Sequence, residues 1–141
     1  MNREQFFKDG QTDGKDTLWN EDGTPIDLIT WKDGEMHGEY VNWHSNGNKS
    51  CEYHYQDGKP HGVCILWHEN GQKETHSNYE YGKREGKTMG WYENGQIQYE
   101  DNYEDGLLNG YSVSFRENGS KRKEENYKHG FCWNRTNHVE G

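Results

Sequence analysis

The sequence predicts an all-β fold, an elongated single-layer antiparallel sheet made of stacked β-hairpins. The chain repeats itself every 24 residues, and 16 of its 18 glycines fall in three phases of that period. Two further phases hold large aromatic residues. A fixed period of this length is typical of solenoid proteins, in which each unit packs only on its neighbours. We therefore expect one domain built as a repeat solenoid.

The composition alone is typical of a disordered chain. Hydrophobic residues make up 28% of the sequence, the net charge is -9 and the mean hydropathy is -1.48. Six Trp and ten Tyr nevertheless supply large surfaces for burial. We therefore expect a thin aromatic core in place of an aliphatic one.

An aromatic residue opens each unit, and a glycine follows it three residues later. The opening residues are Phe7, Trp31, Tyr55, Tyr79, Tyr103 and Tyr127. They divide the chain into units 7–30, 31–54, 55–78, 79–102 and 103–126, with a C-terminal half-unit or cap at 127–141. Two strands in each full unit predict about ten strands in all.

The third unit shows how a unit should fold. Residues 63–67 are rich in β-branched and aromatic side chains, which predicts a strand. Glu69, Asn70 and Gly71 then predict a three-residue loop, a type I turn with Gly71 in the left-handed region as a G1 bulge. Such a loop pairs position 67 with 73 and position 65 with 75. Residues 79–86, with two glycines four apart, predict a tight polar turn into the next unit.

This pairing predicts a dry face of odd-numbered residues and a wet face of even-numbered ones. The dry face should hold the Trp and Tyr columns with Thr17, Val41, Ile65, Met89 and Val113. The wet face should hold Asp16, Tyr40, Cys64, Thr88, Ser112, Glu52, His76, Glu100 and Glu124.

The order aromatic-x-x-Gly-x-x-x-Gly, aromatic strand and Asn-Gly turn resembles the MORN repeat (membrane occupation and recognition nexus), from Phe7 to about Trp133. It is closer to a bacterial variant, since Tyr40, Cys64 and Ser112 stand where the eukaryotic form has a further glycine. Chains built only of this variant are similar to the YwqK-like antitoxin or immunity family, small cytoplasmic proteins that neutralise a toxin of the same cell. The resemblance implies a binding function and specifies no binding residue.

The residues predict no enzyme, no metal site and no cofactor. His37 and His61 hold equivalent positions, as do His44 and His68, but equivalent residues lie two strands apart, about 9.6 Å, too far to share a zinc ion. Carboxylates such as Glu100 should stay hydrated on an open sheet, where nothing shifts their pKa. The chain also lacks a phosphate-binding P-loop motif.

We expect a cytoplasmic protein that is a monomer when free. The three cysteines are odd in number and lack C-x-x-C spacing, which favours reduced thiols. Five residues between Met1 and the first unit leave no room for a signal peptide, and no apolar run is long enough to span a membrane.

The charge disfavours nucleic acid and anionic membranes as partners. The chain has 25 acidic and 16 basic residues, whereas both of those partners reward clustered Lys and Arg. An acidic surface instead favours a basic protein, such as a toxin enzyme with a basic cleft, and speeds association with it.

Our first hypothesis is therefore a non-catalytic antitoxin or immunity protein that covers the active site of a partner toxin. We expect the partner to contact Tyr40, His44, Leu66, His68, Tyr92, Glu100 and Arg116. Two alternatives remain open: an assembly scaffold that associates through its sheet edges, and a phage-type inhibitor of a defence protein.

Overall fold

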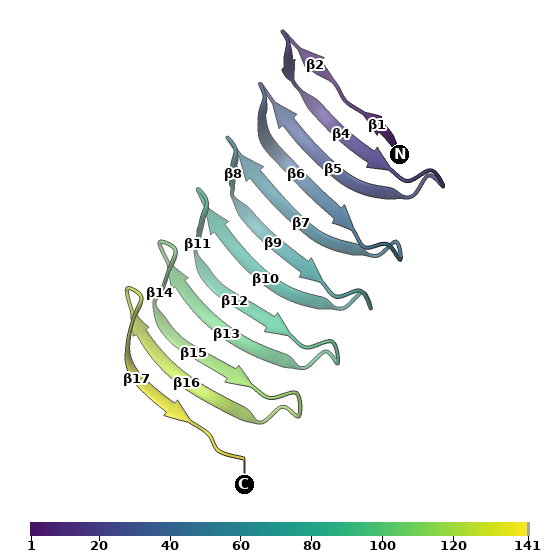
Figure 1. Ribbon diagram of the computed structural model, residues 1–141. Coiled ribbons are helices and arrows are strands. Elements are labelled where there is room, and N and C mark those ends of the chain that lie inside the picture. Colours follow the sequence, from purple (N-terminus) through teal and green to yellow (C-terminus); the bar gives the residue numbers. More distant parts are fainter. Residues whose placement is uncertain (141) are drawn as a thin grey trace.

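The computed structural model describes residues 1–140, and every regular element within them is a β-strand (Figure 1). Residue 141, the end of the last predicted unit, lies outside the described residues. The first strands of the five hairpins are β4 (Gly14–Trp19), β6 (Glu35–Trp43), β9 (Gly62–Trp67), β12 (Gly86–Trp91) and β15 (Gly110–Phe115). The second strands are β5 (Pro25–Lys32), β7 (Lys49–Gln56), β10 (Lys73–Glu80), β13 (Ile97–Glu104) and β16 (Lys121–Lys128).

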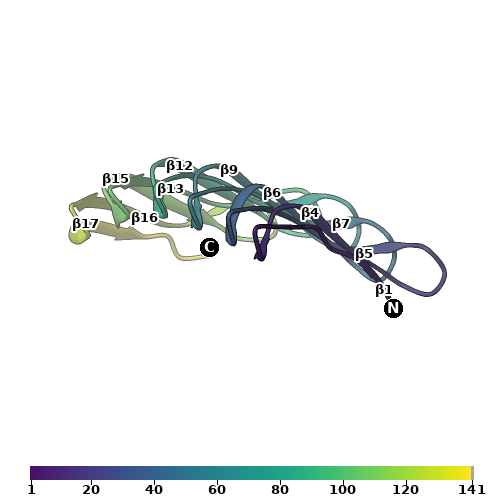
Figure 2. The ribbon, with the colours of Figure 1, turned by 90° about the horizontal axis from the view of Figure 1, so that it is seen from above.

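The hairpins form one open antiparallel sheet in which neighbours along the chain are neighbours in space. The strand order is β1-β4-β5-β6-β7-β9-β10-β12-β13-β15-β16-β17. Its edges are β1 (Asn2–Glu4) and β17 (Phe131–Asn137). The strands lie in a single layer (Figure 2). The predicted all-β ribbon of stacked hairpins is confirmed.

Short strands lie beside the tight turns that join one hairpin to the next. They are β2 (Phe7–Lys8), β3 (Gln11–Thr12), β8 (Lys59–Pro60), β11 (Lys83–Arg84) and β14 (Leu107–Leu108). The strands β2 and β3 pair only with each other, whereas β8, β11 and β14 pair with β7, β10 and β13. Within residues 1–140 we find no helix with the length and apolar character to cross a membrane.

The wide turn inside each hairpin has the predicted geometry. Gly71 has a φ of 87°, its amide donates to the His68 carbonyl at 3.0 Å, and the His68 amide donates to the Gln72 carbonyl at 2.8 Å. This is a type I turn closed by a left-handed glycine. The Gln72 amide also donates to Asn70 Oδ1 at 3.0 Å, so the asparagine closes its own turn.

The tight turn between hairpins has only two central residues. Asp57 and Gly58 have φ values of 49° and 77°, as a type I′ turn requires. The Gly58 amide also donates to the Met36 carbonyl of the preceding unit at 2.9 Å. The same bond recurs from Gly34, Gly82, Gly106 and Gly130, so backbone hydrogen bonds tie each tight turn to the unit before it.

One extra residue in each second strand makes part of the predicted register wrong. Trp67 pairs with Lys73 as predicted, but Ile65 pairs with His76 rather than with position 75, because Glu74 forms a β-bulge. Bulges recur at the equivalent positions Ile26, Ser50, Gln98 and Arg122. Beyond each bulge the strand presents the opposite set of side chains to each face.

The bulges separate the two aromatic columns. We call one side of the sheet the tyrosine face, because it carries Tyr55, Tyr79, Tyr103 and Tyr127. The other side is the tryptophan face, which carries Trp19, Trp43, Trp67, Trp91 and Phe115. Tyr79 lies opposite Gly62 and therefore shares a face with Cys64, not with Ile65 and Trp67. The prediction that both columns share one dry face is wrong.

The prediction of one dry and one wet face is wrong as well. Cys64 and Thr88, expected on the wet face, are buried, and so is Val41 of the expected dry face. Asp16 is also buried, paired with Arg3 of β1 at 2.6 Å. A single layer has no enclosed interior, so small residues on both faces become buried where longer side chains from neighbouring strands cover them.

Candidate protein-binding site

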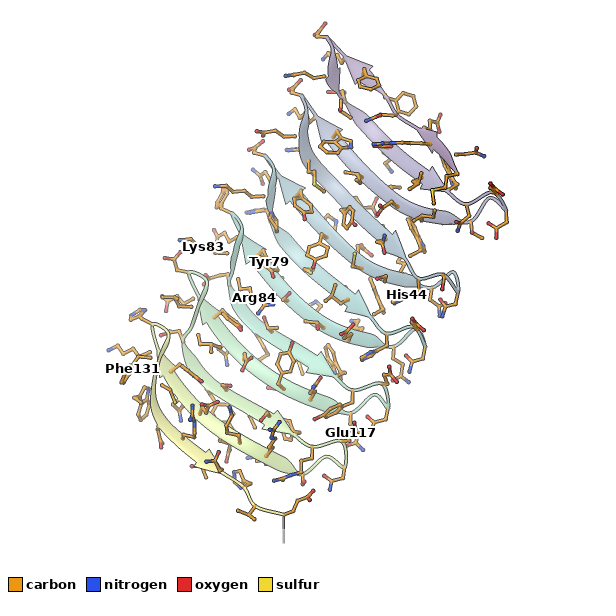
Figure 3. All side chains as sticks on the ribbon, in the orientation of Figure 1. His44, Tyr79, Lys83, Arg84, Glu117 and Phe131 are labelled. Atoms are coloured by element: carbon orange, nitrogen blue, oxygen red, sulfur yellow. The ribbon has the colours of Figure 1, made fainter. Side chains whose placement is uncertain are left out.

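The predicted contact residues do not share one face, contrary to expectation. Tyr40 and Leu66 lie on the tyrosine face, whereas Glu100 lies opposite Met89 on the tryptophan face. The other four stand in one column at the wide-turn edge, where Figure 3 labels His44. They are His44, His68, Tyr92 and Arg116.

The wide-turn column joins the second unit and each later one to the unit that follows it. His44 and His68 each donate from Nε2 to a backbone carbonyl at 2.8 Å, and the Tyr92 hydroxyl donates to one at 2.7 Å. Arg116 donates from Nη2 in the same way. The acceptors, one unit ahead, are the carbonyls of Trp67, Trp91, Phe115 and His138. These side chains therefore hold the array together.

A second pair of histidines has a similar role at the tight-turn edge. The amides of Asp57 and Tyr81 donate to Nδ1 of His37 and His61 at 3.4 and 3.1 Å. The recurrence of histidine thus follows from bonds between units. Among residues 1–140, no group of three or more His, Cys, Asp or Glu side chains is placed to hold a metal ion.

Aromatic rings fill the tyrosine face where the second unit meets the third. Tyr40, Tyr53 and Tyr55 form a cluster with ring centroids 6.1 to 6.4 Å apart. Burial raises the pKa of Tyr40 to about 12, and burial also raises the pKa of the Cys51 and Cys64 thiols beside the cluster. Both thiols therefore stay protonated at neutral pH and are poor nucleophiles.

Arg84 bridges the tyrosine column further along the same face. Figure 3 labels Arg84 and Tyr79 on this face, and Arg84 Nε donates to the Tyr79 hydroxyl at 3.2 Å. Arg84 Nη1 donates to the Tyr103 hydroxyl at 3.1 Å. The guanidinium also lies 5.2 Å from the centroid of the Tyr103 ring, within the range of a cation–π contact. This part of the face is closed by mutual contacts.

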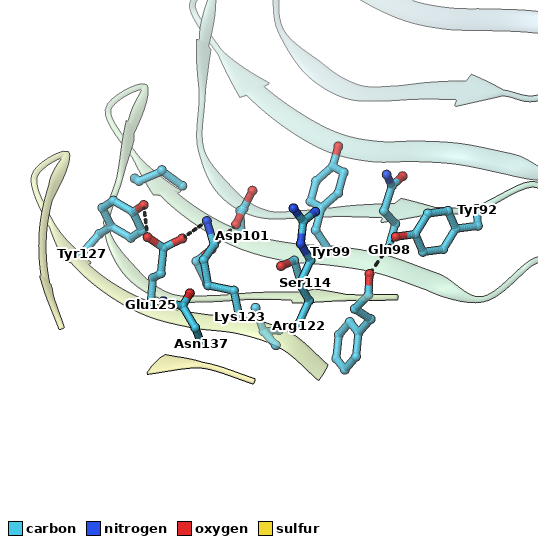
Figure 4. A pocket seen from close by; sticks show the side chains of 14 residues that line it. Tyr92, Gln98, Tyr99, Asp101, Ser114, Arg122, Lys123, Glu125, Tyr127 and Asn137 are labelled. Atoms are coloured by element: carbon cyan, nitrogen blue, oxygen red, sulfur yellow. Dashed lines mark hydrogen bonds and ion pairs between the residues drawn. The ribbon is translucent and has the colours of Figure 1, made fainter. Parts of the chain in front are cut away.

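The tyrosine face opens into a groove of about 490 Å³ in the fourth and fifth units (Figure 4). Its lining includes Tyr92, Gln98, Tyr99, Asp101, Ser112, Ser114, Arg122, Lys123, Glu125, Tyr127 and Asn137. Small residues create the space, since Gly90 and Ser114 stand where the earlier units have Leu18, Asn42 and Leu66. We take this groove as the candidate site.

Gly90 fixes the position of one wall of the groove. A Cβ on Gly90 would lie 2.2 Å from Cε1 of Tyr99, the residue opposite it on β13. The Tyr99 ring therefore lies across the strand in space that any other residue would need. Gly90 has no positive φ, so this close approach is what demands glycine here.

A buried carboxylate organises the C-terminal end of the groove. Glu125 is 3% exposed and binds Lys123 Nζ at 2.6 Å, Arg135 Nη2 at 2.6 Å and the Tyr127 hydroxyl at 3.0 Å. Burial alone would raise the pKa of Glu125, but hydrogen bonds from these partners lower it to about 2. The carboxylate is thus ionised and fully engaged within the chain.

The register of β17 places Arg135 beside Glu125. Trp133 forms a bulge, and Arg135 then pairs directly with Glu125. Asn134 stands where earlier units have a glycine with a φ near 100°, as at Gly62 and Gly110. The last strand therefore follows a different path into the sheet.

Carboxylates on the tryptophan face are paired within the chain. Glu52 binds Lys49 Nζ at 3.1 Å, and Glu100 binds Lys87 Nζ at 3.7 Å. Lys121, Tyr111 and His138 bind Glu124 and lower its pKa to about 2. Glu100, a predicted contact residue, therefore already has a cationic partner.

The stacked hairpins and the groove define a class: an open β-ribbon repeat protein with a recessed surface on one face. Residues 36–57, 60–81 and 84–105 match a family model described as a MORN repeat variant. The chain thus carries three consecutive MORN-type repeats, each beginning just after one tight turn and ending in the next. A search of curated proteins gives no match. MORN repeats suggest a repeat protein involved in binding.

Proposed function

We propose that this protein is a non-catalytic, cytoplasmic antitoxin or immunity protein that binds a basic toxin enzyme and occludes its active site. The groove on the tyrosine face supports this proposal most directly. Its rim offers Gln98, Tyr99 and Arg122, whose side chains form no hydrogen bond to another unit among the described residues, unlike those of the wide-turn column. Tyr and Arg are the side chains most often found at the energetic centre of protein interfaces.

The charge distribution supports a basic partner. The exposed wide-turn edge carries Glu69, Glu93 and Glu117 one unit apart, and the chain as a whole has a net charge of -9. Such a field raises the rate of encounter with a positively charged protein. A phage-type inhibitor of a defence protein would use the same surface.

A growth assay tests the proposal. A candidate toxin encoded next to this chain is expressed in a bacterial host with and without the chain. We expect the chain to restore growth, and we expect Ser114→Trp, which fills the groove, to abolish the rescue. Lys32→Trp adds the same ring at an exposed position outside the groove and should rescue growth fully. If neither the parent chain nor Lys32→Trp restores growth although both are expressed in soluble form, the antitoxin proposal is contradicted.

Assembly through the sheet edge is a second candidate, favoured by one feature of β17. Phe131 and Trp133 are 72% and 62% exposed on this edge strand. Exposed aromatic side chains beside unpaired backbone groups favour pairing with another strand. Sedimentation of the free chain separates the two candidates, because the antitoxin proposal predicts a monomer at micromolar concentration and a scaffold predicts larger species.

A further inference from the structure

Arg122 is set apart from the other arginines among residues 1–140, because its side chain makes no hydrogen bond or ion pair within the chain. The others are Arg3, which binds Asp16; Arg84, which binds Tyr79 and Tyr103; Arg116, which binds backbone carbonyls; and Arg135, which binds Glu125. An arginine without a partner is notable in a chain with more acidic than basic residues.

The β-bulge of the last hairpin places Arg122 on the rim of the groove. Arg122 stands at the extra position between Lys121 and Lys123, and Gln98 stands at the equivalent position one unit earlier. The two side chains extend to the same side of the sheet (Figure 4). Ser114 lies between their strands, paired with Lys123 on one side and Tyr99 on the other.

Hydrogen-bond donors that have no partner in the described chain line the groove beside Arg122. They are the guanidinium of Arg122, the side-chain amide of Gln98 and the hydroxyl of Ser114, all of which line the groove. The nearby carboxylates are already engaged, since Asp101 accepts from Ser112 Oγ at 2.5 Å and Glu125 binds Lys123 and Arg135. The unpartnered guanidinium of Arg122 therefore makes this part of the groove rim locally positive on an acidic protein.

We propose that Arg122, with Gln98 and Ser114 beside it, binds a carboxylate side chain on an extended segment of the partner protein. This inference rests on the proposed function and names the recognition chemistry of its site. A guanidinium matches a carboxylate through two parallel hydrogen bonds, a geometry that a lysine ammonium lacks. The rings of Tyr92 and Tyr99 line the same groove and offer flat surfaces for the neighbouring side chains of the segment.

This pocket gives the acidic ribbon a means of choosing its partner. The overall field attracts any basic protein, so it supplies speed with little selectivity. The acidic surface of the ribbon repels an acidic residue of the partner at most positions, whereas the guanidinium of Arg122 binds it. Attraction at one point and repulsion elsewhere together set the docking position and reject basic proteins that lack the acidic residue.

Nuclear magnetic resonance tests the pocket without the natural partner. The Nε–Hε signal of Arg122 is followed while the blocked peptide acetyl-Tyr-Glu-Tyr-amide is added to the full chain. We expect this signal and the Gln98 side-chain amide signals to shift. The dissociation constant, read from the Gln98 amide signals in every protein, should rise about tenfold for acetyl-Tyr-Gln-Tyr-amide and also for the Arg122→Gln protein, because each change removes one charge of the pair.

Lys128→Gln is the matched control, since it removes one positive charge at an exposed position outside the groove. Binding of the Glu peptide should be unchanged in this variant. Equal affinity for the Glu and Gln peptides, or equal weakening by Lys128→Gln, would overturn the carboxylate pocket. Inorganic phosphate that shifts the same signals at least as strongly as the Glu peptide would overturn the assignment to a protein segment.

The pocket and the proposed function can fail separately. If the chain rescues growth from its toxin and Arg122→Gln rescues equally well, the pocket is wrong and the antitoxin function stands. If the Glu peptide binds at Arg122 but no neighbouring toxin is neutralised, the pocket stands and the proposed function is wrong.

Discussion

Gly90 is a residue whose missing side chain shapes the candidate site. In Gly90→Ala, the new Cβ meets the Tyr99 ring at 2.2 Å. Overpacking of this kind costs about 1 to 3 kcal/mol, more than the roughly 0.5 to 1 kcal/mol that alanine gains over glycine in a strand. We therefore expect Gly90→Ala to lower the free energy of unfolding, measured by urea denaturation.

The same substitution made in a Tyr99→Ala protein shows whether the clash with the Tyr99 ring causes the loss of stability. With the ring removed, Gly90→Ala should be neutral or stabilising, so the sign of its effect reverses. An equal loss of stability in both backgrounds would show that Gly90 is needed for another reason.

The lowered pKa of Glu125 predicts how the free energy of unfolding depends on pH. Its folded pKa of about 2 lies below the ordinary value of 4.5, so its contribution is complete above pH 4.5 and is lost as the pH falls through the folded pKa. A shift of this size corresponds to roughly 3 kcal/mol at neutral pH. We expect Glu125→Gln to be about 2 to 3 kcal/mol less stable at pH 7 and nearly as stable as the parent at pH 2.

Unfolding of both proteins by urea across this pH range measures the effect. Glu74→Gln provides the control, since Glu74 is exposed and should leave the pH dependence unchanged. A constant difference between Glu125→Gln and the parent from pH 7 to pH 2 would contradict the ion-pair account.

At the scale of the element, the wide turn explains why asparagine is preferred in it. Asn70 accepts a hydrogen bond from the Gln72 amide within its own turn, and its Nδ2 donates to the Glu93 carbonyl of the next unit at 2.8 Å. Aspartate keeps the first bond and loses the second. We expect Asn70→Asp to destabilise the chain by about 0.5 to 1.5 kcal/mol, measured by urea unfolding.

Asn118 offers a matched position for this prediction. It accepts from the Ser120 amide at 2.9 Å but makes no hydrogen bond to a later turn among the described residues. Asn118→Asp should therefore change stability by much less than Asn70→Asp. Equal effects at the two positions would show that the bond between turns contributes little.

The turns and strands were predictable, whereas the faces were not. Gly71 and Asn70 identify their turn because few residues adopt its backbone conformation. The bulge at Glu74 leaves the 24-residue period unchanged, so periodicity reports the repeat length and not the register within it. The bulge at Glu74 moved Tyr79 to the face of Cys64, and the equivalent bulge at Gln98 placed Glu100 on the face opposite Tyr40.

The groove could have been found in part from the sequence. Its signal is the change from Leu66 to Gly90 and Ser114 at one phase of the repeat. The contact residues predicted from the sequence were instead large side chains. His68 and Tyr92 are large because each forms a hydrogen bond to the backbone of the next unit. Such a bond cannot be predicted from the sequence of one unit alone.

At the scale of the whole molecule, the ribbon should tolerate the loss of a complete unit. Deletion of residues 55–78 joins the second unit to the fourth with equivalent turns, bulges and inter-unit bonds at the new junction. Since each unit contacts only its neighbours, we expect a folded ribbon about 10 Å shorter, with lower thermal stability. Circular dichroism and small-angle X-ray scattering measure both properties.

A half-unit deletion serves as the contrast. Removal of residues 55–66 keeps the composition similar but breaks the phase of the turns and strands. We expect this variant to be unfolded or aggregated. A folded half-unit deletion, or an unfolded full-unit deletion, would contradict the repeat account.

Footprinting of the purified complex with its partner by hydroxyl radicals and mass spectrometry tests the central claim most directly. The tyrosine face of the fourth and fifth units should be the binding surface, so oxidation of Tyr99 should fall strongly in the complex while oxidation of Phe131 and Trp133 stays unchanged. Protection confined to Phe131 and Trp133, with Tyr99 oxidised as in the free chain, would contradict it and place the partner at the edge of the sheet.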